Sequence, residues 1–221
     1  PTPNIILDNF LPNKLALDLY DECCSLDRSL WTQFNRNGSH MEECVKIHHM
    51  DVGRRFVEEM NSSKTIQWLE SITGINGLIP DPHILGAGYS RSYRGDTLQV
   101  HNDFNWNNTL QLHRAVSIII YLTPGWVVNW GGGLDFYDAD RKNVVNTVNC
   151  LFNRMMLWEY SPKNYHGYDK PLTCPDTMMR TTFRIFYYTS NSTYKEDDPP
   201  HRSQYWYDYD NNIAYDKKEE K

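Results

Sequence analysis

Two side chains that can bind a metal ion stand one residue apart in the segment His101-Asn102-Asp103. The segment closes a strand-like run, 97–102, and residues i and i+2 of a strand point to the same face. The imidazole of His101 and the carboxylate of Asp103 are therefore expected side by side, at the separation that neighbouring ligands of one metal require. On its own, such a pair is more simply explained as a polar surface turn.

Two residues further along the chain change that interpretation. His166 follows an apolar run around Trp158, and Arg180 opens another strand-like segment. Two histidines and one carboxylate form the facial triad of non-haem Fe(II) oxygenases, which leaves adjacent positions for a co-substrate and O2. A buried arginine is costly unless it is paired, and its guanidinium can hold a carboxylate through two hydrogen bonds. Arg180 is therefore a candidate for binding a dicarboxylic co-substrate behind the iron.

The residues that precede this region are expected to support it, mainly as helices. A run from Lys14 to Cys24 carries enough apolar residues for one buried stripe, and Pro12 suits the first turn of a helix. A second helical pattern covers 52–73, where the polar residues 61–63 can divide it in two. Gly74 fits the end of that helix.

From residue 84 onward the pattern changes to short strands separated by turn residues, which is typical of a sandwich or jelly-roll barrel. The expected strands are Ile84–Tyr93, Thr97–Asn102, Ala115–Leu122, Gly133–Tyr137, Val144–Val148, Met155–Tyr160 and Arg180–Thr189. The predicted fold is α+β, a single domain over 1–221 with helical support in 1–87, a jelly-roll core in 88–190 and a tail in 191–221. We expect the aromatic run 205–209 of that tail to dock on the body, and the charged residues 216–221 to fray.

Composition sets limits on the class of protein. The chain of 221 residues is 40% hydrophobic and 23% charged, as a globular domain is, and its longest apolar run, 116–122, is far too short to cross a bilayer. Five cysteines at low density, with no secretory leader at Pro1, favour reduced thiols and a cytoplasmic location. The net charge of −6 divides into −5 for 1–87, +2 for 88–190 and −3 for 191–221, which argues against nucleic acid as a partner.

At this point the chain resembles a known family. The segment Tyr93-Arg94-Gly95-Asp96-Thr97-Leu98-Gln99-Val100-His101-Asn102-Asp103 is similar to the iron motif of Fe(II)/2-oxoglutarate-dependent dioxygenases, and within them to the prolyl 4-hydroxylase-like branch. The likeness continues in the same order through further segments over residues 88–190. These are Ser117 to Thr123, Trp126, Gly132 to Phe136, Asn153 to Trp158, His166 and Arg180 to Thr182.

The resemblance implies a role for each matching residue and a double-stranded β-helix as the core. His101, Asp103 and His166 would bind Fe(II). Arg180 would bind the distal carboxylate of 2-oxoglutarate. The other residues of the co-substrate pocket would be Tyr121, Thr182, Leu98 and Tyr93. O2 would take the remaining position, and ascorbate is an optional cofactor of the family.

Three positions depart from the family pattern. The aromatic residue often found at Leu98 is absent, so the phenol contact to the co-substrate must come from Tyr121 or Tyr93. Many collagen-type members carry lysine where this chain has Arg180. The segment 167–179 is long, so Arg184, which would face the same side of its strand, competes with Arg180; we favour Arg180 because Thr182 follows it.

The activity implied is hydroxylation of an unactivated C–H bond, most closely that of a prolyl residue in a peptide or protein. A carboxylate at Asp103 favours hydroxylation over halogenation, because it leaves no vacant position for a halide. Two alternatives remain open at this point: a hydroxylase of a free amino acid or small metabolite, and a jelly-roll module that binds or senses without catalysis. No membrane partner is expected, and the oligomeric state is not predicted.

Overall fold

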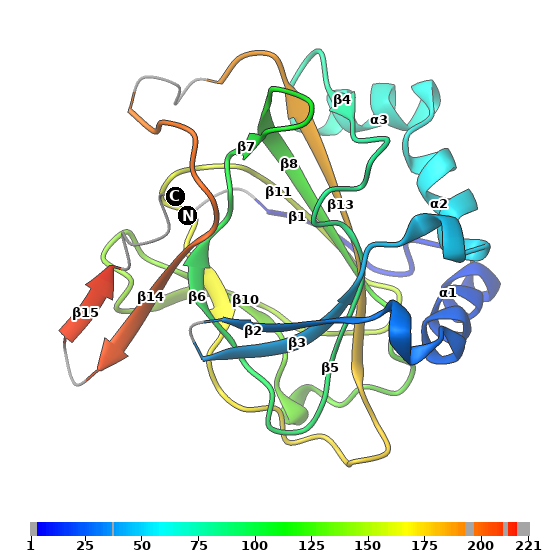
Figure 1. Cartoon of the computed structure of the whole chain (residues 1–221), viewed down its shortest axis with the longest axis vertical. Coiled ribbons are helices and arrows are strands. Elements are labelled where there is room, and N and C mark those ends of the chain that lie inside the picture. The colour runs from blue at the N-terminus through cyan, green and yellow to red at the C-terminus, as the bar shows by residue number, and fades with distance from the viewer. Residues whose placement is uncertain (1–3, 37, 193–196, 210–211, 216–221) are drawn as a thin grey trace.

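The computed structural model describes residues 4–36, 38–192, 197–209 and 212–215, and its core is a pair of facing β-sheets (Figure 1). The larger sheet has the strand order β1-β11-β8-β13-β5-β3-β2, with β4 on β13 and β7 on β8. The smaller sheet has the order β10-β9-β12-β6-β14-β15. This arrangement confirms the predicted jelly-roll core.

The strands of the larger sheet are β1 (Asn4–Leu7), β2 (Thr32–Arg36), β3 (Ser39–Cys44), β4 (Ile79–Pro80), β5 (Gly88–Ser92), β7 (Trp106–Asn107), β8 (Leu112–Tyr121), β11 (Met155–Glu159) and β13 (Arg180–Thr189). Those of the smaller sheet are β6 (Leu98–Asn102), β9 (Leu134–Tyr137), β10 (Val144–Val148), β12 (His166–Tyr168), β14 (Gln204–Tyr209) and β15 (Asn212–Tyr215). The helices are α1 (Asn13–Ser25), α2 (Val52–Met60) and α3 (Ser63–Thr73), with short 3₁₀ turns at Arg28–Leu30, Ile47–His49 and Val128–Trp130.

The two long central strands, β8 and β13, pair antiparallel and divide the apolar residues between two cores. Phe183 and Ile185 face the helices, where they pack with Leu19 and other residues of α1 to α3. Tyr121, the last residue of β8, belongs to a second cluster that fills the space between the sheets. Because side chains alternate along a strand, one set packs against the helices and the other set points into the space between the two sheets.

The helices lie against the outer face of the larger sheet (Figure 1). The predicted boundaries are confirmed: α2 ends at Met60, α3 starts at Ser63 after an N-cap by Ser62, and Gly74 ends it with a φ of 74°. In the part of the chain that the structure describes, no helix is both long and apolar enough to span a membrane. All five cysteines are free, as expected.

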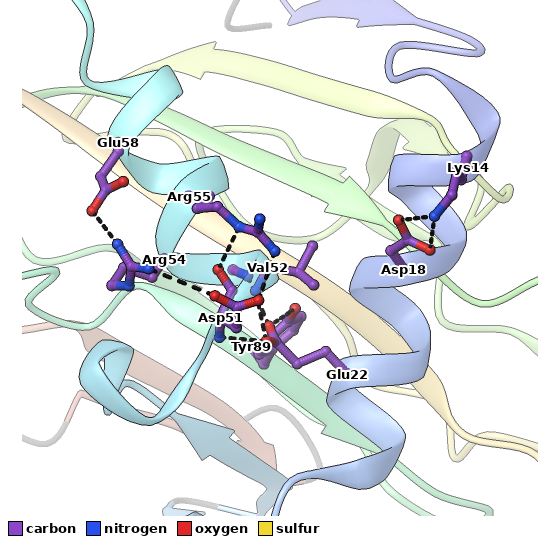
Figure 2. Close-up of polar contacts among 10 residues, drawn as sticks. Lys14, Asp18, Glu22, Asp51, Val52, Arg54, Arg55, Glu58 and Tyr89 are labelled. Carbon is purple, nitrogen blue, oxygen red and sulfur yellow. Dashed lines mark hydrogen bonds and ion pairs between the residues drawn. The ribbon is translucent and has the colours of Figure 1, made fainter.

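One carboxylate joins α1, α2 and the larger sheet (Figure 2). Glu22 of α1 accepts hydrogen bonds from the backbone N–H groups of Asp51, Val52 and Gly53, at 2.6, 2.8 and 2.8 Å, and from the hydroxyl of Tyr89 on β5 at 2.8 Å. Free N–H groups at a helix start need acceptors, and a negative charge is favourable there. The N-cap residue Asp51 gives α2 no such side-chain bond, so Glu22 caps the helix from a neighbouring one.

The N-terminal part contains more strand than the sequence indicated. Besides the helices it supplies β1, β2, β3 and β4, all of which extend the larger sheet. The hairpin of β2 and β3 escaped notice because the run 32–36 is largely polar, so it lacks the apolar alternation that reveals a half-buried strand. The aromatic tail docks as predicted, because β14 pairs with β6. Residues 216–221 lie outside the described residues.

We predict that Glu22→Ala lowers the free energy of unfolding by about 1–3 kcal/mol, because it leaves three N–H groups at the start of α2 without their acceptor. The matched control on the same helix is Asp18→Ala, which breaks only the exposed ion pair with Lys14 and should change stability by less than about 0.5 kcal/mol. Urea denaturation measures both variants. Equal losses would contradict the capping role of Glu22.

Candidate metal centre

Strand pairing brings the three predicted metal ligands together. His101 lies on β6, Asp103 directly follows that strand, and His166 on β12 is the antiparallel partner of His101. The Nε2 atoms of His101 and His166 lie 3.6 Å from Oδ1 and Oδ2 of Asp103, respectively. One donor atom from each residue falls within 4.8 Å of the others, and no other set of His, Cys, Asp or Glu in the described residues is so arranged.

Hydrogen bonds on the far side of each ring orient both imidazoles. Nδ1 of His101 lies 2.9 Å from the carbonyl oxygen of Gln99, and Nδ1 of His166 lies 2.9 Å from that of Asn164. A carbonyl oxygen only accepts, so we assign the ring proton of each histidine to Nδ1. Each Nε2 then presents a lone pair toward Asp103, as a metal ligand does.

The charges of the centre favour a cation. Burial lowers the pKa of His166 to about 4, so its ring is neutral near neutral pH. Burial alone would raise the pKa of Asp103, but the charge of Arg114 and the contacts with the two imidazoles outweigh burial and hold the pKa of that carboxyl well below its usual range. The carboxylate of Asp103 therefore meets the neutral ring of His166, and Nε2 of His101 lies beside them. This donor set fits a divalent metal ion.

Arg114 is a functional residue that the sequence reasoning missed. Its Nη2 lies 3.1 Å from Oδ2 of Asp103, its Nε donates to Oγ of Ser117 at 3.0 Å, and its side chain is 1% exposed. The guanidinium lies over the rings of Phe186 and Phe104, at 3.6 and 4.5 Å from their centroids. The sequence did contain one indication of this role. Arg114 is a charged residue within the apolar run 112–121, and a buried charge needs a buried partner.

Arg180 is buried between the two sheets, 4% exposed, with its charge unpaired. Its Nε donates to the carbonyl of Gly132 at 2.7 Å, and its guanidinium carbon lies 4.7 and 5.2 Å from the ring centroids of Tyr168 and Tyr121. No carboxylate among the described residues forms an ion pair with it. The buried hydroxyl of Tyr121 also has no hydrogen-bond partner in the described part of the chain. A buried cation beside an unsatisfied hydroxyl fits a carboxylate ligand.

Gly132 allows Arg180 to sit so close to the backbone. A Cβ atom at this position would lie 2.7 Å from Cδ of Arg180, and the φ of 76° is in the left-handed region. Only glycine satisfies both constraints easily, which gives this residue of the Gly131-Gly132-Gly133 turn a definite structural purpose.

The remaining candidate residues divide into two groups. Leu98 packs against the cluster between the sheets, and its cross-strand partner is Tyr168, whose ring lies beside Arg180. Tyr168 thus places an aromatic ring next to Leu98, the position at which the family often has an aromatic residue. The sequence analysis did not identify Tyr168 as a candidate. Thr182, also buried, shares a hydrogen bond of 2.7 Å with Ser90.

The other group, Tyr93 and Arg184, has carboxylate partners of its own. The hydroxyl of Tyr93 donates to Glu42 at 3.4 Å, in a network that includes Arg91. Arg184, the competitor of Arg180, forms an ion pair of 2.6 Å with Glu43. The two arginines share a strand face, as predicted, but only Arg184 has a carboxylate partner within the described residues.

Comparisons with known proteins agree with this geometry. Residues 87–188 match the family model of the 2OG-Fe(II) oxygenase superfamily. Prolyl 3-hydroxylase OGFOD1 of Mus musculus is 31% identical over 111 residues, 48% of this chain and 18% of that protein. The Xenopus laevis OGFOD1 is 30% identical over 112 residues, 48% of this chain and 20% of that protein. The chain thus matches about a fifth of the length of these curated relatives.

Solved structures share the fold at low sequence identity. A prolyl-4-hydroxylase of Pseudomonas putida has a TM-score of 0.63 at 15% identity, covering 86% of this chain and 94% of that one. HygX of Streptomyces hygroscopicus, solved with nickel and 2-oxoglutarate bound, has a TM-score of 0.57 at 11% identity, covering 86% and 84%. The order of motifs, the paired sheets and the matched residues agree with one another: residues 87–188 of the chain are similar to the 2OG-Fe(II) oxygenase superfamily.

Proposed function

We propose that the chain is an Fe(II)- and 2-oxoglutarate-dependent oxygenase that hydroxylates an unactivated C–H bond, with a prolyl residue of a peptide or protein as its substrate class. The observation that carries the proposal is the presence of two interior sites, each suited to one partner of the reaction. One is the set of three converging donors, and the other is the buried Arg180 with the unsatisfied Tyr121 hydroxyl. The similarity to prolyl hydroxylases supports the substrate class.

The chain's own residues would hold the metal on one face. His101, Asp103 and His166 would be its ligands, with both rings fixed by the carbonyl contacts at Nδ1. Arg114 would fix the orientation of the Asp103 carboxylate through Oδ2. Bound Fe(II) would supply the activation of O2 that couples oxidation of 2-oxoglutarate to succinate and CO2 with insertion of one oxygen atom into the substrate.

The co-substrate would be oriented from the opposite end. Arg180 would hold its distal carboxylate through charge-assisted hydrogen bonds, and Tyr121 would add its hydroxyl. Apolar residues around them, among them Leu134 and Met156, exclude water, so the attraction acts in a low dielectric. We favour Arg180 over Arg184 for this role, because Glu43 already neutralises Arg184.

A small molecule is the second candidate substrate. The observation in its favour is the likeness to HygX, which was also solved with nickel, 2-oxoglutarate and hygromycin B bound, at a TM-score of 0.57. All five cysteines are free, which supports a reducing, cytoplasmic location for the protein, whichever substrate it takes.

The first prediction concerns turnover. Protein supplied with Fe(II), 2-oxoglutarate and O2 should form succinate, slowly without substrate and faster with the correct one. His101→Ala should abolish the signal, because it removes a metal ligand. Quantifying succinate by mass spectrometry, across proline-containing peptides, free amino acids and aminoglycosides, also separates the two substrate classes. Wild-type protein that forms no succinate would leave the non-catalytic binding module as the better description.

A second prediction separates the two arginines. Arg180→Ala should raise the KM for 2-oxoglutarate by about 10- to 100-fold while metal binding persists, because it removes a charge-assisted pair. Arg184→Ala, which breaks the pair with Glu43, should lower stability and change this KM little. Steady-state succinate kinetics measure both. The opposite ranking would show that Arg184 binds the co-substrate.

A third prediction concerns Arg114. Arg114→Gln should lower the free energy of unfolding of the metal-free protein by about 3–5 kcal/mol, because it leaves the Asp103 carboxylate buried without a counter-charge. Added Co(II) would restore a positive charge there, so it should raise the melting temperature more in the variant than in wild type. Arg184→Gln should show no such difference. Equal stabilisation by Co(II) in all three proteins would exclude the pairing role.

A further inference from the structure

The residues that follow the matched family region return to the strand that carries His101 and leads into Asp103. β14 pairs antiparallel with β6, with Gln204 opposite Asn102 and Tyr205 opposite His101 (Figure 1). Residues 197–203, which lead into β14, contact the loop that follows Asp103. These residues lie beyond position 188, where the family match ends.

Tyr205 covers one face of a metal ligand. Its ring stacks on the imidazole of His101, with centroids 4.9 Å apart and planes at 22°, and the residue is 8% exposed. On another side it meets Phe34 of β2, with centroids 6.2 Å apart. Together with the contact between Nδ1 and the Gln99 carbonyl, this stack restricts rotation of the His101 ring.

Asn105, two residues after Asp103, is held by the same segment. Its side-chain amide donates to Oδ2 of Asp198 at 2.9 Å and to the backbone oxygens of Asp198 and Pro199, both at 3.1 Å. The backbone N–H of His201 donates to Oδ1 of Asn105 at 2.8 Å, and the N–H of Asn105 donates back to the carbonyl of His201 at 3.3 Å. Every polar atom of the Asn105 side chain is thus bound by residues 198–201.

Asp198 anchors the segment to the larger sheet as well. Its Oδ2 accepts a hydrogen bond of 2.6 Å from the hydroxyl of Tyr160, which directly follows β11, and its Oδ1 lies 3.1 Å from Nε2 of His201. The backbone carbonyl of Asn105 in turn accepts from the N–H of Arg114 at 2.8 Å. The loop after Asp103 is therefore fixed between Arg114 on β8 and the C-terminal segment.

We propose that residues 198–205 form an accessory part of the metal centre, in which Tyr205 and Asp198 act as positioning residues for His101 and Asp103. The proposal rests on the proposed metal-binding function. Asp103 lies past the end of β6, so it lacks the ladder hydrogen bonds that hold His101 and depends on its loop for position. Outer contacts of this kind orient metal ligands, and their loss weakens metal affinity by about 10- to 100-fold.

The test measures the affinity of the full chain for Co(II) by calorimetry, without 2-oxoglutarate or substrate. Tyr205→Leu removes the stack, and Asp198→Ala removes the anchor; each should weaken Co(II) binding by about 10- to 100-fold. The matched control, Asp197→Ala, changes the exposed neighbouring acid and should bind as wild type does. Tyr205→Phe, which keeps the ring, should bind Co(II) more tightly than Tyr205→Leu.

The possible outcomes separate this proposal from the one that it rests on. Absence of Co(II) binding that depends on His101 in the wild type would refute the metal site itself. Binding in the wild type with unchanged affinity in Tyr205→Leu and Asp198→Ala would leave the metal site intact and overturn the accessory role. If Tyr205 and Asp198 had a purely structural role, the metal-free variants would melt at a lower temperature. Their affinity for Co(II), measured well below that melting temperature, would be unchanged. Should Asp198→Ala fail to fold, Tyr205→Leu and Tyr205→Phe decide the question as a pair.

Discussion

The register of one three-residue strand, β12, determines the geometry of the whole site. Its pairing with β6 sets His166 opposite His101 and Tyr168 opposite Leu98, with an irregularity between the two pairs. Gly167 lies between them, and a Cβ atom there would come within 2.6 Å of the carbonyl oxygen of Leu98. The close approach of β12 to β6 therefore depends on glycine at this position. Since side chains alternate along a strand, a shift by one residue would turn both His166 and Tyr168 away from the interior.

The same strand thus links the two halves of the proposed chemistry. His166 belongs to the metal centre, and Tyr168, two residues later on the same face, lies beside the guanidinium of Arg180. The fold treats the arginines that point into it differently. Arg114 is paired with Asp103 and Arg184 with Glu43, whereas Arg180 has no carboxylate partner in the described structure and lies among the Gly132 carbonyl, the Cys150 thiol and two tyrosines. A buried charge in this state would be stabilised by an anionic ligand.

The sequence carried enough information to find the residues whose role depends on local spacing. The alternation around His101 and Asp103, the strand that begins at Arg180 and the Gly74 helix end all follow from periods of two or about four residues. Residues whose role depends on a distant partner were missed. Tyr168 lies on a strand of three residues, which is too short to show an alternating pattern. The role of Arg114 becomes visible only through its ion pair with Asp103, which follows β6 of the facing sheet. The hydrogen bonds between Asp198 and Asn105 join segments far apart in the chain, which no local pattern reports. The β2–β3 hairpin is local, but its run 32–36 is too polar to show the alternation of a half-buried strand.

The central claim is that the donor triad and Arg180 form one site that a single dicarboxylate spans. The most direct measurement is the visible absorption spectrum of the protein under anaerobic conditions, with Fe(II) added first and 2-oxoglutarate second. The structure predicts a new charge-transfer band that appears only when both are present and saturates at one 2-oxoglutarate per chain. No band at saturating Fe(II) and 2-oxoglutarate, or a band that survives in His166→Ala, would contradict it.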